Sequence, residues 1–173
     1  MAFSTKFSAR PILVAVDLQP HSLRAIEYAL SLASESNRSL LVLHVVHETA
    51  ESAGFYRRHN RAHPTLPMSD IAADMLRKLL SEAAADTAAA AIETWVVEGI
   101  PANRIAEVAE QVDAQIIVMA SGGRKGFDKF WHGSVTEGVR ERAQRELVLL
   151  PPGVTAQPST GVYSGTRFVQ PAH

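Results

Sequence analysis

The sequence predicts an open, doubly wound α/β fold, in which a five-stranded parallel sheet of Rossmann-like type carries helices on both faces. Two observations lead to this prediction. Five short segments rich in aliphatic residues alternate along the chain with four segments of helical periodicity. Several aliphatic segments are apolar at consecutive positions, which is typical of parallel strands that are buried on both faces. Strands and helices in strict alternation are expected to be joined by right-handed crossovers.

The first strand is expected at residues 12–16 and the second at residues 40–46, both continuously aliphatic apart from His44. The helix between them is expected to include Pro20 as its first residue, a position that proline suits. Its inward face is defined by aliphatic residues at three- and four-residue spacing. These residues are Leu23, Ile26, Leu30 and Ala33.

The second helix is expected to begin at Ser69, with Asp70 opposing the helix dipole in the first turn, and the third strand follows at residues 94–97. The third helix opens at Pro101 and precedes a fourth strand at residues 115–119. It is expected to bury Ile105, Val108, Ala109 and Val112. The fourth helix begins near Gly133 and Ser134, points Val135 and Val139 inward, and leads to a fifth strand at residues 147–150.

The composition argues against several classes of protein. Lys and Arg number 17 and Asp and Glu 18, whereas nucleic-acid-binding domains normally carry a strong basic excess. No cysteine is present, which excludes disulfides and cysteine-ligated zinc. The longest apolar runs, such as residues 116–120, are far shorter than the roughly 20 residues that span a bilayer. Residues 1–10 lack a secretory signal pattern, so we expect a cytoplasmic protein that binds neither nucleic acid nor membrane.

Three regions are expected: an N-terminal extension at residues 1–10, one α/β domain at residues 11–152, and a C-terminal tail at residues 153–173. The tail is rich in Gly, Ser, Thr and Pro, and we predict that it is flexible or orders only against a partner. Residues 48–68 form a long connection with a basic cluster, either a solvated loop or a contact for a phosphate or an acidic partner. The cluster consists of Arg57, Arg58, His59, Arg61 and His63.

Two polar features follow predicted strands. Asp17 comes directly after the first strand, and the Gly-rich segment at residues 121–126 comes directly after the fourth. Ligands of open parallel sheets bind beyond the carboxyl ends of the strands, so both features flank one crevice if these strands are neighbours. Glycines let the backbone approach a phosphate, and the helix start at Gly133 and Ser134 adds free N–H groups and hydroxyls. The segment is equally compatible with an ordinary strand-to-helix loop.

This loop reads Ala120-x2-Gly123-x9-Gly133-Ser134, one substitution away from the pattern Gly-x2-Gly-x9-Gly-[Ser/Thr]. That pattern is typical of nucleotide-binding universal stress proteins, and residues 11–151 resemble this family, in its single-domain, UspA-like form. Four further segments match in order, namely Ile12–Asp17, Leu43–Val46, Glu98–Pro101 and Ile116–Ser121. The resemblance implies an adenine nucleotide α-hydrolase-like fold with strand order 3-2-1-4-5.

The resemblance also implies a site for ATP, AMP or ADP, with Mg²⁺ as an optional companion. Asp17 would form a hydrogen bond with the adenine or ribose end of the nucleotide, and the backbone of Val45 would recognise the edge of the adenine. The backbone at Ala15 and Met119 would form the pocket wall. The residues expected along the ribose and phosphates are Ala120, Gly123, Gly133, Ser134, Val135 and Thr136.

Two positions depart from the family pattern. Ala120 stands where the pattern has glycine, and its methyl group is harmless at negative φ but obstructive at positive φ. Gln19 stands where the family often has a serine that caps the first helix, and glutamine caps helices poorly.

Two functions are compatible with the sequence. One is an adenine-nucleotide-binding, stress-response regulatory protein that acts as a homodimer without strong catalytic turnover. The other is a nucleotide-free dimeric scaffold or stress protein of the same family. No Ser–His–Asp or paired-carboxylate set is recognisable, so no catalytic residue is predicted, and slow ATP hydrolysis or self-phosphorylation follows only from family analogy. His44 and His47 are expected to point to opposite faces of a strand, so no metal site is predicted.

The fifth strand supports the prediction of a homodimer. Leu147–Leu150 is wholly apolar and is expected to lie at the edge of the sheet. An unprotected apolar edge invites pairing with another chain, and the resemblance implies dimerisation through this strand. A regulatory partner protein is expected, but the sequence does not identify it.

Overall fold

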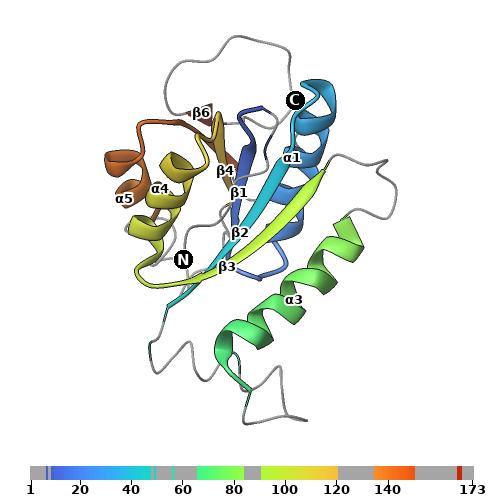
Figure 1. The fold of residues 1–173 in the computed structure, drawn as a ribbon, viewed down its shortest axis with the longest axis vertical. Coiled ribbons are helices and arrows are strands. Elements are labelled where there is room, and N and C mark those ends of the chain that lie inside the picture. The colour runs from blue at the N-terminus through green and yellow to red at the C-terminus, as the bar shows by residue number, and fades with distance from the viewer. Residues whose placement is uncertain are drawn as a thin grey trace.

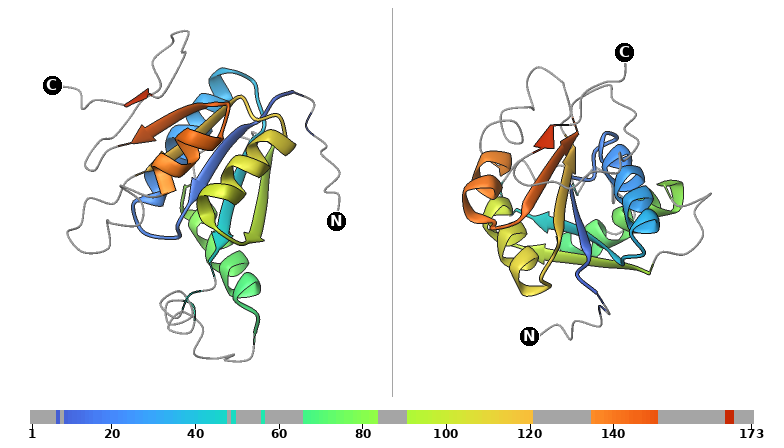
Figure 2. Two further views of the ribbon diagram at one scale, coloured as in Figure 1. Left: turned by 90° about the vertical axis from the view of Figure 1, so that its left-hand side faces the viewer. Right: turned by 90° about the horizontal axis from the view of Figure 1, so that it is seen from above.

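The computed structural model describes residues 7, 9–47, 49, 56, 66–83, 91–120 and 135–150, together with the backbone of residues 167–168. These residues form one parallel sheet with two helices on each face (Figures 1 and 2).

The sheet has the strand order β3-β2-β1-β4-β5-β6, and every pair of neighbours is parallel. The strands are β1 (Ile12–Val16), β2 (Leu40–Val46), β3 (Ile92–Glu98), β4 (Ile116–Ala120), β5 (Glu146–Leu150) and β6 (Arg167–Phe168). The predicted order of five strands, 3-2-1-4-5, is therefore confirmed, and the short strand β6 is an addition at one end.

Four helices cover the sheet. The helices are α1 (Ser22–Glu35), α3 (Met68–Ala83), α4 (Pro101–Gln111) and α5 (Thr136–Arg142). Helices α1 and α3 pack on one face, and α4 and α5 pack on the other.

Helix α1 begins at Ser22, two positions after Pro20, so the predicted start was wrong. Residues 17–21 form instead a turn that is closed by Asp17.

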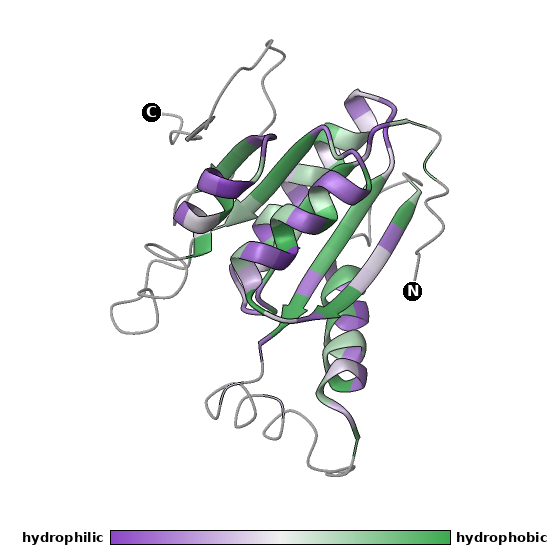
Figure 3. Cartoon of the chain, turned by 60° about the vertical axis from the view of Figure 1, so that its left-hand side comes forward, coloured by the Kyte–Doolittle hydropathy of each residue, from purple (hydrophilic) through white to green (hydrophobic). Residues whose placement is uncertain are grey.

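Continuous apolar strands reflect burial on both faces. In β1, Ile12, Val14 and Val16 join the core under α1 and α3, whereas Leu13 and Ala15 join the core under α4 and α5. Every residue of β1, β2 and β4 is buried. Figure 3 shows the same contrast, with the central strands hydrophobic along most of their length and α4 divided into hydrophobic and hydrophilic sides. The consecutive apolar residues are thus required by the two-layered core.

Strand β5 is not the outermost strand, contrary to the expectation from sequence. Val148 and Leu149 pair with Arg167 and Phe168 of β6. The sequence analysis missed this strand because two residues in a polar, aperiodic tail carry no strand signal. The other residues of 153–173 lie outside the described part of the chain, so flexibility there stays a prediction.

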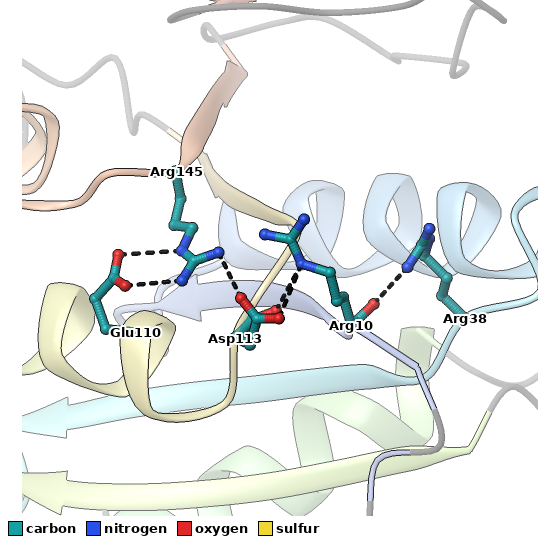
Figure 4. Close-up of polar contacts among 5 residues, drawn as sticks. All are labelled: Arg10, Arg38, Glu110, Asp113 and Arg145. Atoms are coloured by element: carbon teal, nitrogen blue, oxygen red, sulfur yellow. Dashed lines mark hydrogen bonds and ion pairs between the residues drawn. The ribbon is translucent and has the colours of Figure 1, made fainter.

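A charged network closes the end of the sheet at which β1, β4 and β5 begin (Figure 4). The guanidinium of Arg145 donates to both carboxylate oxygens of Glu110, at 3.1 and 2.7 Å, and to Asp113 Oδ1 at 2.7 Å. Arg10 Nε lies 3.2 Å from Asp113 Oδ2, and Arg38 donates to the carbonyl oxygen of Arg10 at 2.9 Å. The network therefore joins the residues before β1 and β5 to the end of α4 and to the start of β2.

The first testable prediction concerns this network. The hydrogen bond from Arg145 is the main cause that lowers the pKa of Glu110 below its ordinary value of 4.5. Stability from this pair is therefore present above the ordinary pKa of a glutamate and is lost as the pH falls through the lower pKa of the folded state. We expect Arg145→Gln to lower the free energy of unfolding at neutral pH by at most about 1 kcal/mol, because solvent screens the half-exposed carboxylates.

Urea unfolding of both proteins between pH 7 and pH 3 measures this difference, which should shrink in acid. Arg140→Gln is the matched control, because among the described residues Arg140 forms its ion pair within α5, with Glu137, and its loss should cost less at every pH. A difference between wild type and Arg145→Gln that does not change with pH would contradict the assignment.

The second prediction concerns the contact between α4 and α5. A methyl group at Gly138 would stand 2.7 Å from the Cβ atom of Ala102. Alanine is preferred to glycine within helices by about 1 kcal/mol, whereas overpacking costs about 1–3 kcal/mol. We expect Gly138→Ala to destabilise the fold by about 1 kcal/mol in urea unfolding. In an Ala102→Gly background the same substitution should become neutral or stabilising, and equal losses in both backgrounds would exclude the steric explanation.

Candidate functional site

The order of the strands reverses between β1 and β4. The two strands are neighbours, with Ala15 paired to Met119, although β1 is followed by α1 on one face and β4 leads to α5 on the other. This is the topological switch point at which open α/β sheets bind ligands. Asp17 directly follows β1, so the structure places it at this switch point.

The Asp17 carboxylate is held by the turn that leads into α1. Oδ1 accepts hydrogen bonds from the amide of Gln19 at 3.0 Å and from the hydroxyl of Ser22 at 2.7 Å. His21 Nε2 lies 2.9 Å from Oδ2, and only 12% of the Asp17 side chain is exposed. Oδ1 thus accepts two hydrogen bonds, whereas among the described residues only His21 lies against Oδ2, so a carboxylate with about four acceptor positions is not saturated by them.

Asp17 is ionised at neutral pH. Burial raises its pKa, but the hydrogen bond and charge of His21, together with the hydrogen bonds from Ser22 and Gln19, outweigh burial and hold the pKa below the ordinary 3.8. Asp17 is predicted from the sequence, whereas His21 and Ser22 are not. The spacing of Ser22 from Asp17 at a helix start was the available signal for the serine, whereas no sequence pattern marked the histidine.

Leu18 adopts a left-handed backbone conformation, with φ at 61°. This conformation costs a non-glycine residue about 1–2 kcal/mol. The side chain of Leu18 is only 9% exposed and packs into the core under α1. Burial of Leu18 therefore offsets the strain of a turn that directs the Gln19 amide back to Asp17. Nothing in the sequence indicates positive φ at a leucine.

Of the other predicted site residues, those that the structure describes lie at strand ends or at the start of α5. Val45 lies near the end of β2, Ala15 near the end of β1 and Met119 near the end of β4. Val135 directly precedes α5, which Thr136 opens. Ala15, Val45, Met119 and Val135 are at most 9% exposed and belong to the core under α4 and α5. Gly123, Gly133 and Ser134 lie outside the described residues.

Ala120 is compatible with the glycine position of the motif. Among the described non-glycine residues, positive φ occurs only at Leu18, Asn37 and Asp113, so Ala120 has an ordinary strand conformation. Its side chain is 5% exposed and packs into the core under α1. The methyl group therefore strains no backbone and is directed into the core.

A buried histidine lies beside this site. His44 Nδ1 is 2.8 Å from the carbonyl oxygen of Val16, and Nε2 is 2.6 Å from the Tyr56 hydroxyl. A carbonyl only accepts, so Nδ1 carries the proton and Nε2 accepts from Tyr56. Burial lowers the pKa of His44 and raises that of Tyr56 to about 12. Both groups are therefore neutral, and they join β2 and Tyr56 to the end of β1.

His47 makes a separate contact, with Nδ1 3.1 Å from the carbonyl oxygen of Gly99. Within the described ranges, no group of three or more His, Cys, Asp or Glu side chains is arranged to hold a metal ion. The helices in those same ranges include none with the length and apolar character needed to cross a membrane.

Comparison with known proteins places the chain in a family. The model of the universal stress protein family matches residues 8–151. The chain is 28% identical to the universal stress protein MJ0531 of Methanocaldococcus jannaschii over 141 residues, which covers 82% of this chain and 81% of the relative.

Solved structures show the same fold. The chain is 25% identical to the universal stress protein UspA of Lactobacillus plantarum, with a TM-score of 0.60 over 82% of this chain and 99% of that structure. A universal stress protein solved in complex with cAMP is 24% identical, with a TM-score of 0.58 over 81% of this chain and 94% of that structure. On the family match over most of its length and on its fold, this chain belongs to the universal stress protein family.

Proposed function

We propose that the protein is a cytoplasmic regulator that binds an adenine nucleotide in the crevice between β1 and β4. The observation that carries the proposal is the ionised Asp17 carboxylate at the switch point, where Gln19 and Ser22 donate to Oδ1, His21 lies beside Oδ2, and the described residues leave acceptor capacity for a ligand. A ribose hydroxyl or the adenine amino group donates a further hydrogen bond to the Asp17 carboxylate. The phosphates lie toward Gly123, Gly133, Ser134 and Thr136, accompanied by Mg²⁺ when the ligand is ATP.

Three observations support this assignment. The loop after β4 keeps the spacing of the family's nucleotide motif at Gly123, Gly133 and Ser134. The departure at Ala120 adds a methyl group that is packed in the core. A protein of the same family, similar to this chain in fold, was solved with cAMP. The backbone at Ala15, Val45 and Met119 forms the wall around the base in this proposal.

We propose that the nucleotide acts as a regulatory ligand and is not turned over rapidly. Asp17 is the ionisable side chain that this proposal assigns to the nucleotide, and its lowered pKa makes it a weak general base at neutral pH. Slow hydrolysis or self-phosphorylation is compatible with this role. Bound nucleotide alters what the protein contacts, including a regulatory partner protein that the sequence does not identify.

The regulator acts as a homodimer in this proposal, with two copies meeting along β5. The apolar sequence of Leu147–Leu150 supports this interface. Light scattering in the micromolar range is expected to give a mass approaching twice the 18.8 kDa of the chain. A mass of one chain at every concentration that can be reached would overturn the dimer.

Nucleotide binding is tested by calorimetric titration of nucleotide-free protein with adenosine, AMP and Mg-ATP. Hydrogen bonds to charged groups contribute about 1.5–3 kcal/mol. Asp17→Asn is therefore expected to weaken all three ligands by roughly 10- to 100-fold. Ser134→Ala is expected to weaken Mg-ATP while leaving adenosine unchanged, because the hydroxyl is assigned to the phosphates.

Asp70→Asn is the control, because Asp70 is exposed in the first turn of α3 and should not affect any ligand. Equal affinity of wild type and Asp17→Asn for the three ligands would show that Asp17 does not contact the nucleotide. An absence of heat and of thermal stabilisation with all three ligands would favour the alternative function, a nucleotide-free dimeric scaffold.

A further inference from the structure

The two sides of the sheet differ in how their strands are protected against pairing with another chain. Strand β3, at one end, carries Glu93, Thr94 and Glu98, and the last two are exposed. Charged and polar side chains on an edge strand discourage association. Strand β5, toward the other end, has Glu146 and then four apolar residues, Leu147–Leu150. That stretch of β5 has no charged side chain of its own to discourage pairing.

Strand β6 occupies the outer side of β5 instead (Figure 2). Arg167 and Phe168 pair in parallel register with Val148 and Leu149. A parallel return requires a crossover of about a dozen residues or more, and residues 151–166 provide that length. The apolar strand is therefore covered by a segment of the same chain at two of its five residues.

We propose that β6 is an intramolecular cap that limits pairing of β5 with a second copy of the chain. The inference rests on the proposed homodimer through β5. The outward backbone groups of Val148 and Leu149 can pair with only one strand at a time, so β6 and the strand of a second copy exclude each other. The tail thereby sets the protein concentration at which two copies associate.

The cap is short enough to be displaced. Parallel pairs are slightly less stable per residue than antiparallel ones, and β6 is shorter than the usual strand of 3–10 residues. A second copy offers the whole of its own five-residue β5. The apparent affinity for a second copy is reduced by the fraction of molecules that are uncapped. Disruption of β6 should therefore strengthen association.

The experiment compares full-length wild type with two double variants. Arg167→Pro with Phe168→Pro disrupts β6, because proline lacks the N–H group needed for strand pairing. Ser159→Pro with Thr160→Pro places the same number of prolines in the tail outside β6. Sedimentation velocity over a range of concentrations gives the dissociation constant of the dimer. Hydrogen exchange on dilute, monomeric samples reports protection of residues 146–150.

The β6 variant is expected to dimerise with a dissociation constant roughly tenfold lower than wild type and to lose protection at residues 146–150 when dilute, whereas the control variant matches wild type. Equal dissociation constants in all three proteins, or weaker association of the β6 variant, would overturn the cap while leaving the dimer in place. Monomers in all three proteins at every concentration would overturn the proposed dimer and the cap with it. Nucleotide affinity, measured in the same samples, is independent of both results.

Discussion

Main-chain pairing between β1 and β4 joins two strands that are far apart in the sequence, and the candidate site depends on this pairing. Ile12 to Ala15 run in register with Ile116 to Met119, so the carboxyl ends of both strands finish at the same level. The chain leaves β1 toward one face and reaches α5 on the other, so Asp17 stands at the switch point of the sheet. Any loss of this register would separate Asp17 from the carboxyl end of β4.

Different interactions fix the chain at the two ends of the sheet. Where the strands begin, the arginine and carboxylate network of Arg145, Glu110, Asp113 and Arg10 holds the turn after α4 and the entry to β1. Where the strands end, Leu18 is held in a left-handed conformation, and its buried side chain maintains that turn. Strained residues persist only where the surrounding structure determines their conformation. A rigid sheet, fixed at its opposite end, provides that surrounding for the Asp17 turn.

The fold could be predicted from sequence because the core has two layers. Burial on both faces makes β1, β2 and β4 continuously apolar, and this pattern located all three within one residue of their observed ends. The site was predictable only in part. Asp17 is marked by its place after a strand, whereas His21 depends on the three-dimensional turn. Positive φ at Leu18 follows from tertiary packing, and no local sequence signal indicates it.

Ala120 shows why conformation decides what a motif substitution means. The glycine pattern alone leaves two interpretations of this alanine, a lost nucleotide site or a tolerated methyl group. A strand conformation with ordinary φ removes the backbone reason for glycine, and packing of the methyl group under α1 removes the steric reason. The alanine therefore does not argue for a nucleotide-free protein. The choice between the two functions depends instead on whether the ionised Asp17 carboxylate accepts a hydrogen bond from a nucleotide, as proposed.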